Sequence, residues 1–173
     1  MRIGVLILVV GVAALAGLMA RSASSAPTPT VRCGEIIHHT AFPYLGDRRP
    51  RFRYRLVLGV VSVPPAYLKQ VIPTHRDPWA YWHKSGLVVR AGSESVTVSV
   101  PRAWRSRVAI SWGNNTGIVH TLRIAGCGSD TSMGNAYAGG FYLRSSFACV
   151  PLIFGVGRRR ATVRFGVGRA CLS

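Results

Sequence analysis

The 173-residue chain has few carboxylates: five Asp and Glu stand against 22 Lys and Arg, which gives a formal net charge of +17. The five acidic residues are scattered along the chain, at Glu35, Asp47, Asp77, Glu94 and Asp130. Glycosidases need a pair of carboxylates and calcium sites need a cluster of oxygen ligands, so this composition argues against both classes. Lysine is scarce as well, because twenty of the 22 cationic side chains are arginine.

The common catalytic motifs are also absent. The sequence has no Gly-x-Ser-x-Gly, no His-Glu-x-x-His and no phosphate-binding Gly-x-x-x-x-Gly-Lys. A Ser-His-Asp triad assembled from distant residues stays open, because triads form in space rather than in sequence. We therefore expect a non-enzymatic protein without a cofactor or a metal, and a secreted hydrolase is the alternative.

The first 26 residues resemble a sorting signal. Arg2 precedes an uninterrupted apolar stretch at 3–20, which is followed by small and polar residues up to Ala26. This layout is typical of a secretory signal peptide, and 18 apolar residues also meet the lower limit for a membrane anchor, about 17. Both interpretations place the rest of the chain outside the cytoplasm, secreted or anchored. Removal of 1–26 takes Arg2 and Arg21 with it and leaves a charge of +15.

Cysteine usage agrees with export. The four cysteines all follow the leader, and an even count in an exported chain predicts two disulfides. Three pairings are possible, and we expect Cys127–Cys149 to close a local loop and Cys33–Cys171 to join the two ends of the domain. Zinc is the weaker interpretation, because no two cysteines have the short spacing that structural zinc sites use.

From residue 51 onward, apolar and polar residues alternate with period two, and turn residues recur every 8 to 12 positions or so, a pattern typical of strands. The alternation is clearest at 96–100, 108–112, 118–124 and in the hairpin 150–167. We expect an all-β fold: an antiparallel two-sheet β-sandwich of about eight strands over 51–173, after a linker or arm at 27–50. The proline-rich stretch 64–84 is predicted to be a long loop with a helical turn near 66–71.

Parts of the second half resemble a known group. Val96–Gly113, "AGGFYLR" at 138–144, "CVPL" at 149–152 and "ATVRFGVGRAC" at 161–171 resemble a group of small, uncharacterised secreted β-domain proteins of high-GC Gram-positive bacteria. The resemblance covers about residues 85–171. It implies an exported, disulfide-bonded β-domain, and it implies no reaction, ligand or catalytic residue.

The arginines are the strongest chemical signal. Four of them share one parity, so an extended chain would place their guanidinium groups on one face, opposite Phe52, Tyr54 and Leu56: Arg49, Arg51, Arg53 and Arg55. The turn Arg158-Arg159-Arg160 and the residues Arg102, Arg105 and Arg107 add to them. Guanidinium groups bind phosphate and carboxylate in a two-pronged manner, so these residues are candidate anion ligands. The alternative is a solvated outer face that keeps a sheet edge from aggregating.

Two other groups of residues have both a functional and a structural interpretation. Trp79, Tyr81 and Trp82 could form a platform on which a sugar or a base stacks, or could cover the core as a lid. His38 and His39, with Glu35 nearby, lack a third ligand for a metal, and we expect a surface pair. His120 lies on the apolar parity of its strand, where we expect a hydrogen-bonded core histidine.

Together these features predict an exported β-sandwich module that contacts anionic polymers of the envelope or the extracellular space, or an acidic partner protein. Nucleic acid could bind through charge, without sequence specificity, because no fold signature for base recognition is present. Membrane contact is expected only through an uncleaved N-terminal segment. A structural accessory of a membrane partner is a further alternative.

Overall fold

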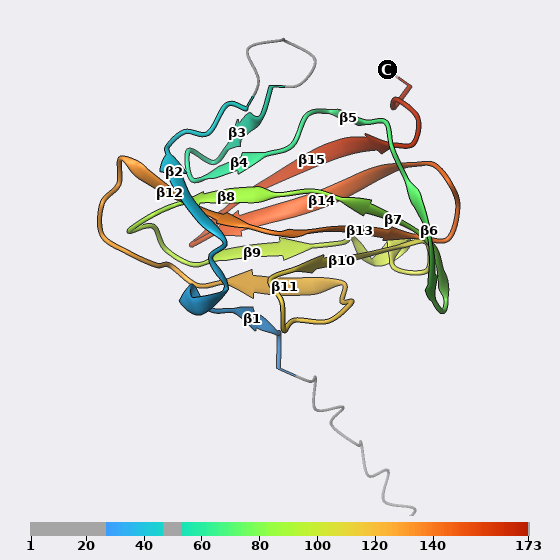
Figure 1. The fold of residues 1–173 in the computed structure, drawn as a ribbon, viewed down its shortest axis with the longest axis horizontal. Coiled ribbons are helices and arrows are strands. Elements are labelled where there is room, and N and C mark those ends of the chain that lie inside the picture. The colour runs from blue at the N-terminus through green and yellow to red at the C-terminus, as the bar shows by residue number, and fades with distance from the viewer. Residues whose placement is uncertain (1–26, 47–52, 173) are drawn as a thin grey trace, which may run out of the picture.

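The computed structural model describes residues 27–46 and 53–172, and these residues are built almost entirely of β-strands (Figure 1). Helical structure among them is limited to the short 3-10 turns η1 (Cys33–Glu35) and η3 (Arg102–Trp104). The predicted all-β class is therefore confirmed. In this part of the chain no helix has the length and apolar character needed to cross a membrane. The predicted signal or anchor segment at 1–26 lies outside the described residues.

The described residues form fifteen strands, more than the eight or so that the sequence predicted, and these are arranged in three hydrogen-bonded sheets. The six-stranded sheet has the order β1 (Thr30–Val31), β11 (Thr121–Ile124), β9 (Val96–Ser99), β14 (Ala148–Val156), β15 (Arg159–Val167) and β5 (Tyr67–Leu68). The four-stranded sheet has the order β10 (Val108–Trp112), β13 (Gly139–Leu143), β7 (Trp79–Lys84) and β6 (Ile72–Arg76). The five-stranded sheet has the order β2 (His38–Ala41), β12 (Met133–Tyr137), β8 (Leu87–Arg90), β4 (Val61–Val63) and β3 (Arg55–Val57).

The two smaller sheets are halves of one layer. Strand β7 runs on into β8, and β12 runs on into β13, as can be followed in Figure 1. Tyr137 pairs with Leu87 in one sheet and Gly140 pairs with Lys84 in the other, so the register does not change across the interruption. The Ser85 N–H donates a 2.7 Å hydrogen bond to the Gly139 carbonyl at this point. The three sheets therefore form the two layers of the predicted sandwich.

The core lies between these layers. The Phe141 ring of β13 and the Phe165 ring of β15 have centroids 5.4 Å apart, which joins the four-stranded to the six-stranded sheet. Trp112 is fully buried, and its indole N–H donates to the Ser85 carbonyl at 3.0 Å. Most of the inward positions predicted from the alternation beyond residue 95 are buried, whereas Ile118, His120 and Val163 are only partly buried. The buried ones are Val96, Val98, Val100, Val108, Ile110, Trp112, Leu122, Ile124, Val150, Leu152, Phe154, Val156, Phe165 and Val167.

The proline-rich stretch 64–84 is not the predicted loop, and it has no helical turn at 66–71. It contains β5, β6 and β7, with β5 pairing parallel to β15. Pro73 lies in β6, the edge strand of its sheet. An edge strand tolerates proline because one of its sides has no neighbouring strand to accept a backbone hydrogen bond. The segment 27–50, expected as a linker or arm, contributes β1 and β2 to two sheets in its described part, 27–46.

The predicted pairing of the cysteines was wrong: Cys33–Cys171 and Cys127–Cys149 are replaced by Cys33–Cys127 and Cys149–Cys171. Two intramolecular disulfides are consistent with an extracytoplasmic location. The first bridge follows from the parallel pairing of β1 with β11, in which Val31 is the partner of Ile124. Each strand is followed within three residues by its cysteine, so the two sulfur atoms meet at the same end of the strands.

The second bridge follows from a reversal of the chain after β15. Cys149 is the strand partner of Gly166, and the C-terminal segment folds back over that glycine. A Cβ on Gly166 would lie 2.5 Å from the Arg169 carbonyl oxygen and 2.7 Å from the Cys171 nitrogen. The missing side chain of Gly166 therefore lets Cys171 return to the face from which Cys149 projects.

Candidate functional site

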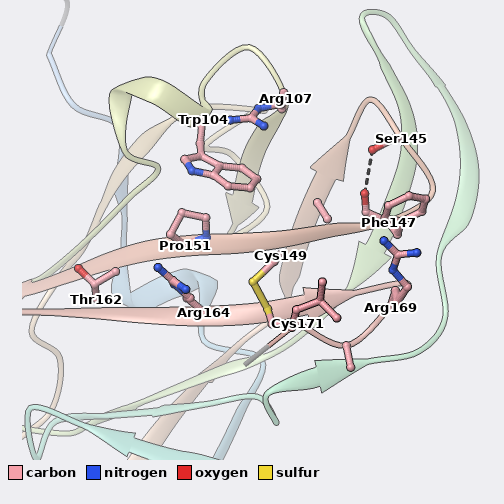
Figure 2. A pocket seen from close by; sticks show the side chains of 13 residues that line it. Trp104, Arg107, Ser145, Phe147, Cys149, Pro151, Thr162, Arg164, Arg169 and Cys171 are labelled. Atoms are coloured by element: carbon pink, nitrogen blue, oxygen red, sulfur yellow. Dashed lines mark hydrogen bonds between the residues drawn. A yellow bond between two sulfur atoms is a disulfide. The ribbon is translucent and has the colours of Figure 1, made fainter.

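A groove with a volume of about 620 Å³ lies on the outer face of β14 and β15. This volume is within the range of small-molecule sites, roughly 300 to 1,000 Å³. Figure 2 shows Pro151 and the Cys149–Cys171 disulfide along its floor, Trp104 and Arg107 on one side, and Phe147 and Arg169 on the other. The groove is therefore built from three segments: η3 with its following turn, the β14–β15 hairpin, and the C-terminal return.

Two of the groove's arginines are stacked on aromatic rings. The guanidinium carbon of Arg107 lies 4.1 Å from the ring centroid of Trp104, and that of Arg169 lies 4.2 Å from the centroid of Phe147. Stacking fixes the plane of a guanidinium group while N–H groups at its edge can still bind an anion. In Arg107 the Nη2 group also donates a 3.3 Å hydrogen bond to the Ala103 carbonyl, and its other N–H groups remain for an anion. Phe147 is 46% exposed, and the Ser145 hydroxyl donates to its carbonyl at 2.8 Å (Figure 2). The groove thus presents oriented cationic groups beside exposed apolar surface.

The groove continues onto a basic sheet face. Cross-strand partners point to the same side of a sheet, so the register places Arg123, Thr97, Gly155 and Arg160 in one row on the outer face of the six-stranded sheet. Arg164 is the partner of Pro151 on this same face and lines the groove. We call the set Arg107, Arg123, Arg160, Arg164 and Arg169 the basic face. None of the residues in the six strands of this sheet is Asp or Glu.

The predicted row of four arginines does not form an outer face in the described residues. Arg49 and Arg51 lie outside them, and Arg53 is exposed in an isolated bridge to Gly46. The predicted parity was wrong at Arg55, because the hairpin pairs Arg55 with Val63 and Val57 with Val61, all three valines being buried. Leu56, predicted to face inward, is 46% exposed.

Arg55 has a structural environment. Its guanidinium carbon lies 4.9 Å from the Phe165 centroid, and it donates hydrogen bonds to the carbonyls of Pro64 and Arg164, both at 3.3 Å. Burial lowers the pKa of the Arg55 side chain. A long cationic side chain can cover apolar surface in this way while its head group reaches polar atoms. Arg55 is therefore part of the packing at the edge of the core.

The three arginines of the predicted turn, Arg158, Arg159 and Arg160, have different surroundings. Arg159 donates to the Leu58 carbonyl at 3.0 Å, and Arg160 donates to the carbonyls of Gly157 and Arg159 at 2.7 and 2.8 Å. Arg158 is exposed at the tip of the hairpin. Of these three residues, the register places Arg160 on the basic face.

The three predicted platform rings are separated by the strand they share. Trp79 is buried and Tyr81 packs against the core, so both face inward from β7. Trp82 has the opposite parity and pairs with Tyr142 of β13, with ring centroids 6.4 Å apart. The pair that faces outward is therefore Trp82 and Tyr142, and the strand period alone separates Trp82 from the other two rings.

The three histidines with predicted roles, His38, His39 and His120, have separate surroundings. His38 and His39 are exposed, and His39 Nδ1 is 3.0 Å from the Oδ1 atom of the buried Asn135. The prediction of a hydrogen-bonded core histidine at His120 was wrong, because the residue is only partly buried and its Nε2 has no hydrogen-bond partner among the described protein atoms. Its ring centroid lies 6.2 Å from that of Trp79. Groups of three potential metal ligands do not occur in 27–46 or 53–172.

Glu35 is a buried carboxylate whose role the sequence did not reveal. Its oxygens accept hydrogen bonds from the backbone N–H groups of Arg32, Asn114 and Asn115. Burial by itself would raise the pKa of Glu35, but these bonds and the nearby Arg32 charge hold it below its usual value of 4.5. Glu35 thus stays ionised and ties the turn after β10 to η1.

The comparisons with known proteins give no match: no family model, curated protein or solved structure resembles the chain significantly. The resemblance to small secreted β-domain proteins therefore stays a prediction. The groove is lined by no His, Asp or Glu residue. The sequence pointed to Arg107 as one of many arginines but not to the groove, because its three segments are brought together only by the fold.

Proposed function

We propose that this protein is an exported, non-enzymatic β-sandwich module that binds an acidic polymer of the cell envelope or the extracellular space through its basic face. The observation that carries the proposal is the gathering of five arginines on one side of the molecule, two of them held on aromatic rings. The two disulfides support export, and the leader supports either secretion or anchoring.

The groove would hold one acidic group of the polymer. Arg107, Arg164 and Arg169 surround an apolar floor, so a phosphate or carboxylate can be bound by guanidinium groups while a neighbouring apolar part contacts Phe147. Arg123 and Arg160 then offer further contacts along the same sheet face, where Thr97 lies in the row between them and Thr162 follows Arg160 on β15. No specific observation favours the hydrolase or the membrane-accessory alternative.

The test compares two triple variants that lose the same charge. One is R107Q/R164Q/R169Q in the groove, and the control is R53Q/R76Q/R158Q, whose residues are exposed elsewhere. Binding of long-chain polyphosphate and of polyglutamate is measured over a salt series. For polyphosphate, the groove variant should bind at least tenfold more weakly than the unmodified protein. The slope of log affinity against log salt concentration should fall in magnitude by about two, since three phosphate contacts are lost and each contributes roughly 0.7.

The control should keep nearly the full affinity and slope. Equal losses in both variants would show that only the overall charge matters, and would contradict a defined basic face. A comparison of the two polymers decides whether phosphate or carboxylate is preferred, and binding of neither would overturn the proposal.

A further inference from the structure

The outer face of the four-stranded sheet carries a second surface with a different character. Trp82 of β7 is the strand partner of Ile72 in β6 and of Tyr142 in β13, so the three side chains project from the same side. The rings of Trp82 and Tyr142 are inclined by 36°, and Ile72 is 46% exposed. We call Ile72, Trp82 and Tyr142 the aromatic face.

A hollow of about 280 Å³ adjoins the two rings. Its other walls include Lys84, Ser111 and Asn114, which bring an ammonium, a hydroxyl and an amide group beside the aromatic surface. The backbone N–H of Asn114 is bonded to Glu35, which fixes the residue's position at the rim. The hollow therefore combines a stacking surface with several neutral or singly charged hydrogen-bonding groups.

Charge distinguishes the ligands that such a surface can take. A single-stranded nucleic acid stacks its bases on aromatic rings, but it also needs a cationic groove for its phosphates. Lys84 is the one charged residue among those that line the hollow, whereas Arg123, Arg160 and Arg164 project from the outer face of the six-stranded sheet in the other layer. The two layers meet through their inner faces at Phe141 and Phe165, so their outer faces point in opposite directions.

A neutral sugar fits these features better. The C–H groups of a pyranose ring carry partial positive charge and stack on the negative face of an aromatic ring. Its hydroxyls need donors and acceptors at the edge of that ring, and Ser111, Asn114 and Lys84 supply them. We propose that the aromatic face is a binding site for a neutral oligosaccharide, with one sugar ring on Trp82 and Tyr142 and its hydroxyls in the hollow.

The experiment is calorimetric titration of the full chain with four soluble neutral probes: cellohexaose, xylohexaose, mannohexaose and chitohexaose. At least one should bind saturably, with an affinity that changes little with salt. W82A and Y142A should each weaken that binding at least tenfold, and Trp82→Phe and Tyr142→Phe should retain most of it because they keep a ring. The control W104A, on the groove, should bind the sugar like the unmodified protein.

Three results would overturn the proposal. The first is that none of the four probes binds. The second is that W82A/Y142A binds as well as the unmodified protein while its circular dichroism and thermal melting are unchanged. The third is that an oligo-dT strand binds and depends on Trp82, which would assign the face to nucleic acid. Because the probes are uncharged, failure here is separate from failure of the polymer binding proposed for the basic face.

Discussion

Glu35 and Asn114 are 79 positions apart in sequence, and the backbone N–H of Asn114 donates a 2.5 Å hydrogen bond to the Glu35 carboxylate. Gly113 makes this approach possible, because a Cβ there would lie 2.6 Å from the same oxygen and its φ is +80°. One buried carboxylate thus holds together the start of the domain and the turn between β10 and β11. This contact bears on stability, and it also fixes Asn114 at the rim of the hollow beside the aromatic face.

Replacement of Glu35 by Gln should lower the free energy of unfolding by about 2 to 3 kcal/mol near neutral pH, since hydrogen bonds to a charged group contribute about 1.5 to 3 kcal/mol. The folded-state pKa of Glu35 is below 4.5, so its contribution is present above the unfolded value and is lost as the pH falls through the folded one. The stability difference between the protein and E35Q should therefore shrink below pH 4.5.

Urea unfolding over a pH series measures this difference. E94Q is the control, because Glu94 is exposed. If E35Q and E94Q show the same stability at neutral pH, Glu35 does not hold the turn as the hydrogen bonds indicate.

Replacement of Arg55 by Gln should destabilise the fold by about 1 to 2 kcal/mol, because it removes the stacking on Phe165 and two hydrogen bonds to carbonyls. The neighbouring R53Q should change stability by less than about 0.5 kcal/mol, since Arg53 is exposed. Thermal or urea unfolding of both variants compares them directly. If R55Q is as stable as R53Q, Arg55 does not contribute to the packing of the core edge, and the surface position predicted from the sequence would be correct.

The strands were predictable where one face is buried. Val96, Val98 and Val100 alternate with polar residues because one side of β9 packs in the core, and all three are buried. At Arg55 the alternation predicted the wrong face, because Arg55 pairs with the buried Val63 and so projects from the same side of the sheet. The long arginine side chain can lie over apolar surface there, so its charge does not report which face is inside. The prolines misled at 64–84 because an edge strand tolerates Pro73.

The candidate site was less predictable, since it depends on which strands are neighbours. No local pattern joins Trp104, Phe147 and Arg169, which come from three segments. The same holds for the disulfides: the parallel β1–β11 pair brings Cys33 to Cys127, and sequence spacing does not report such a pair. For Trp82 and Tyr142 the signal was present, because strand parity separates Trp82 from Trp79 and Tyr81.

Tyr137 should make the protein sensitive to alkali. Burial, with the negative charge of Glu35 nearby, raises the pKa of Tyr137 from 10.0 to about 12. Between these two values the unfolded chain loses the phenol proton and the folded chain keeps it, so stability should fall as the pH rises through this range. The Y137F variant should lose less stability over this range than the unmodified protein.

Urea unfolding near neutral pH and again between pH 10 and 12 provides the measurement. The control Y67F removes a phenol that is exposed at the sheet edge, and it should keep the alkaline sensitivity. Parallel pH profiles for Y137F and Y67F would show that the buried phenol does not cause the effect.

Substitution of Gly166 by Ala should disturb the Cys149–Cys171 disulfide. The new Cβ would lie 2.5 Å from the Arg169 carbonyl oxygen and 2.7 Å from the Cys171 nitrogen, so the C-terminal return must move away from Cys149. A matched control exists beside the other bridge: Gly34 follows Cys33, and a Cβ there would meet nothing within 4 Å. G34A should therefore oxidise completely.

Thiol labelling under denaturing, non-reducing conditions counts the unpaired cysteines. The unmodified protein and G34A should show none, whereas a fraction of G166A should carry two, because all four cysteines are paired in the native fold. The molecules of G166A that lack the bridge should lose about 3 kcal/mol of stability, the value expected for a loop of some twenty residues. Since Arg169 lines the groove and follows this return, G166A should also weaken polyphosphate binding. Complete oxidation of G166A with unchanged stability would show that Gly166 does not shape the return of the chain.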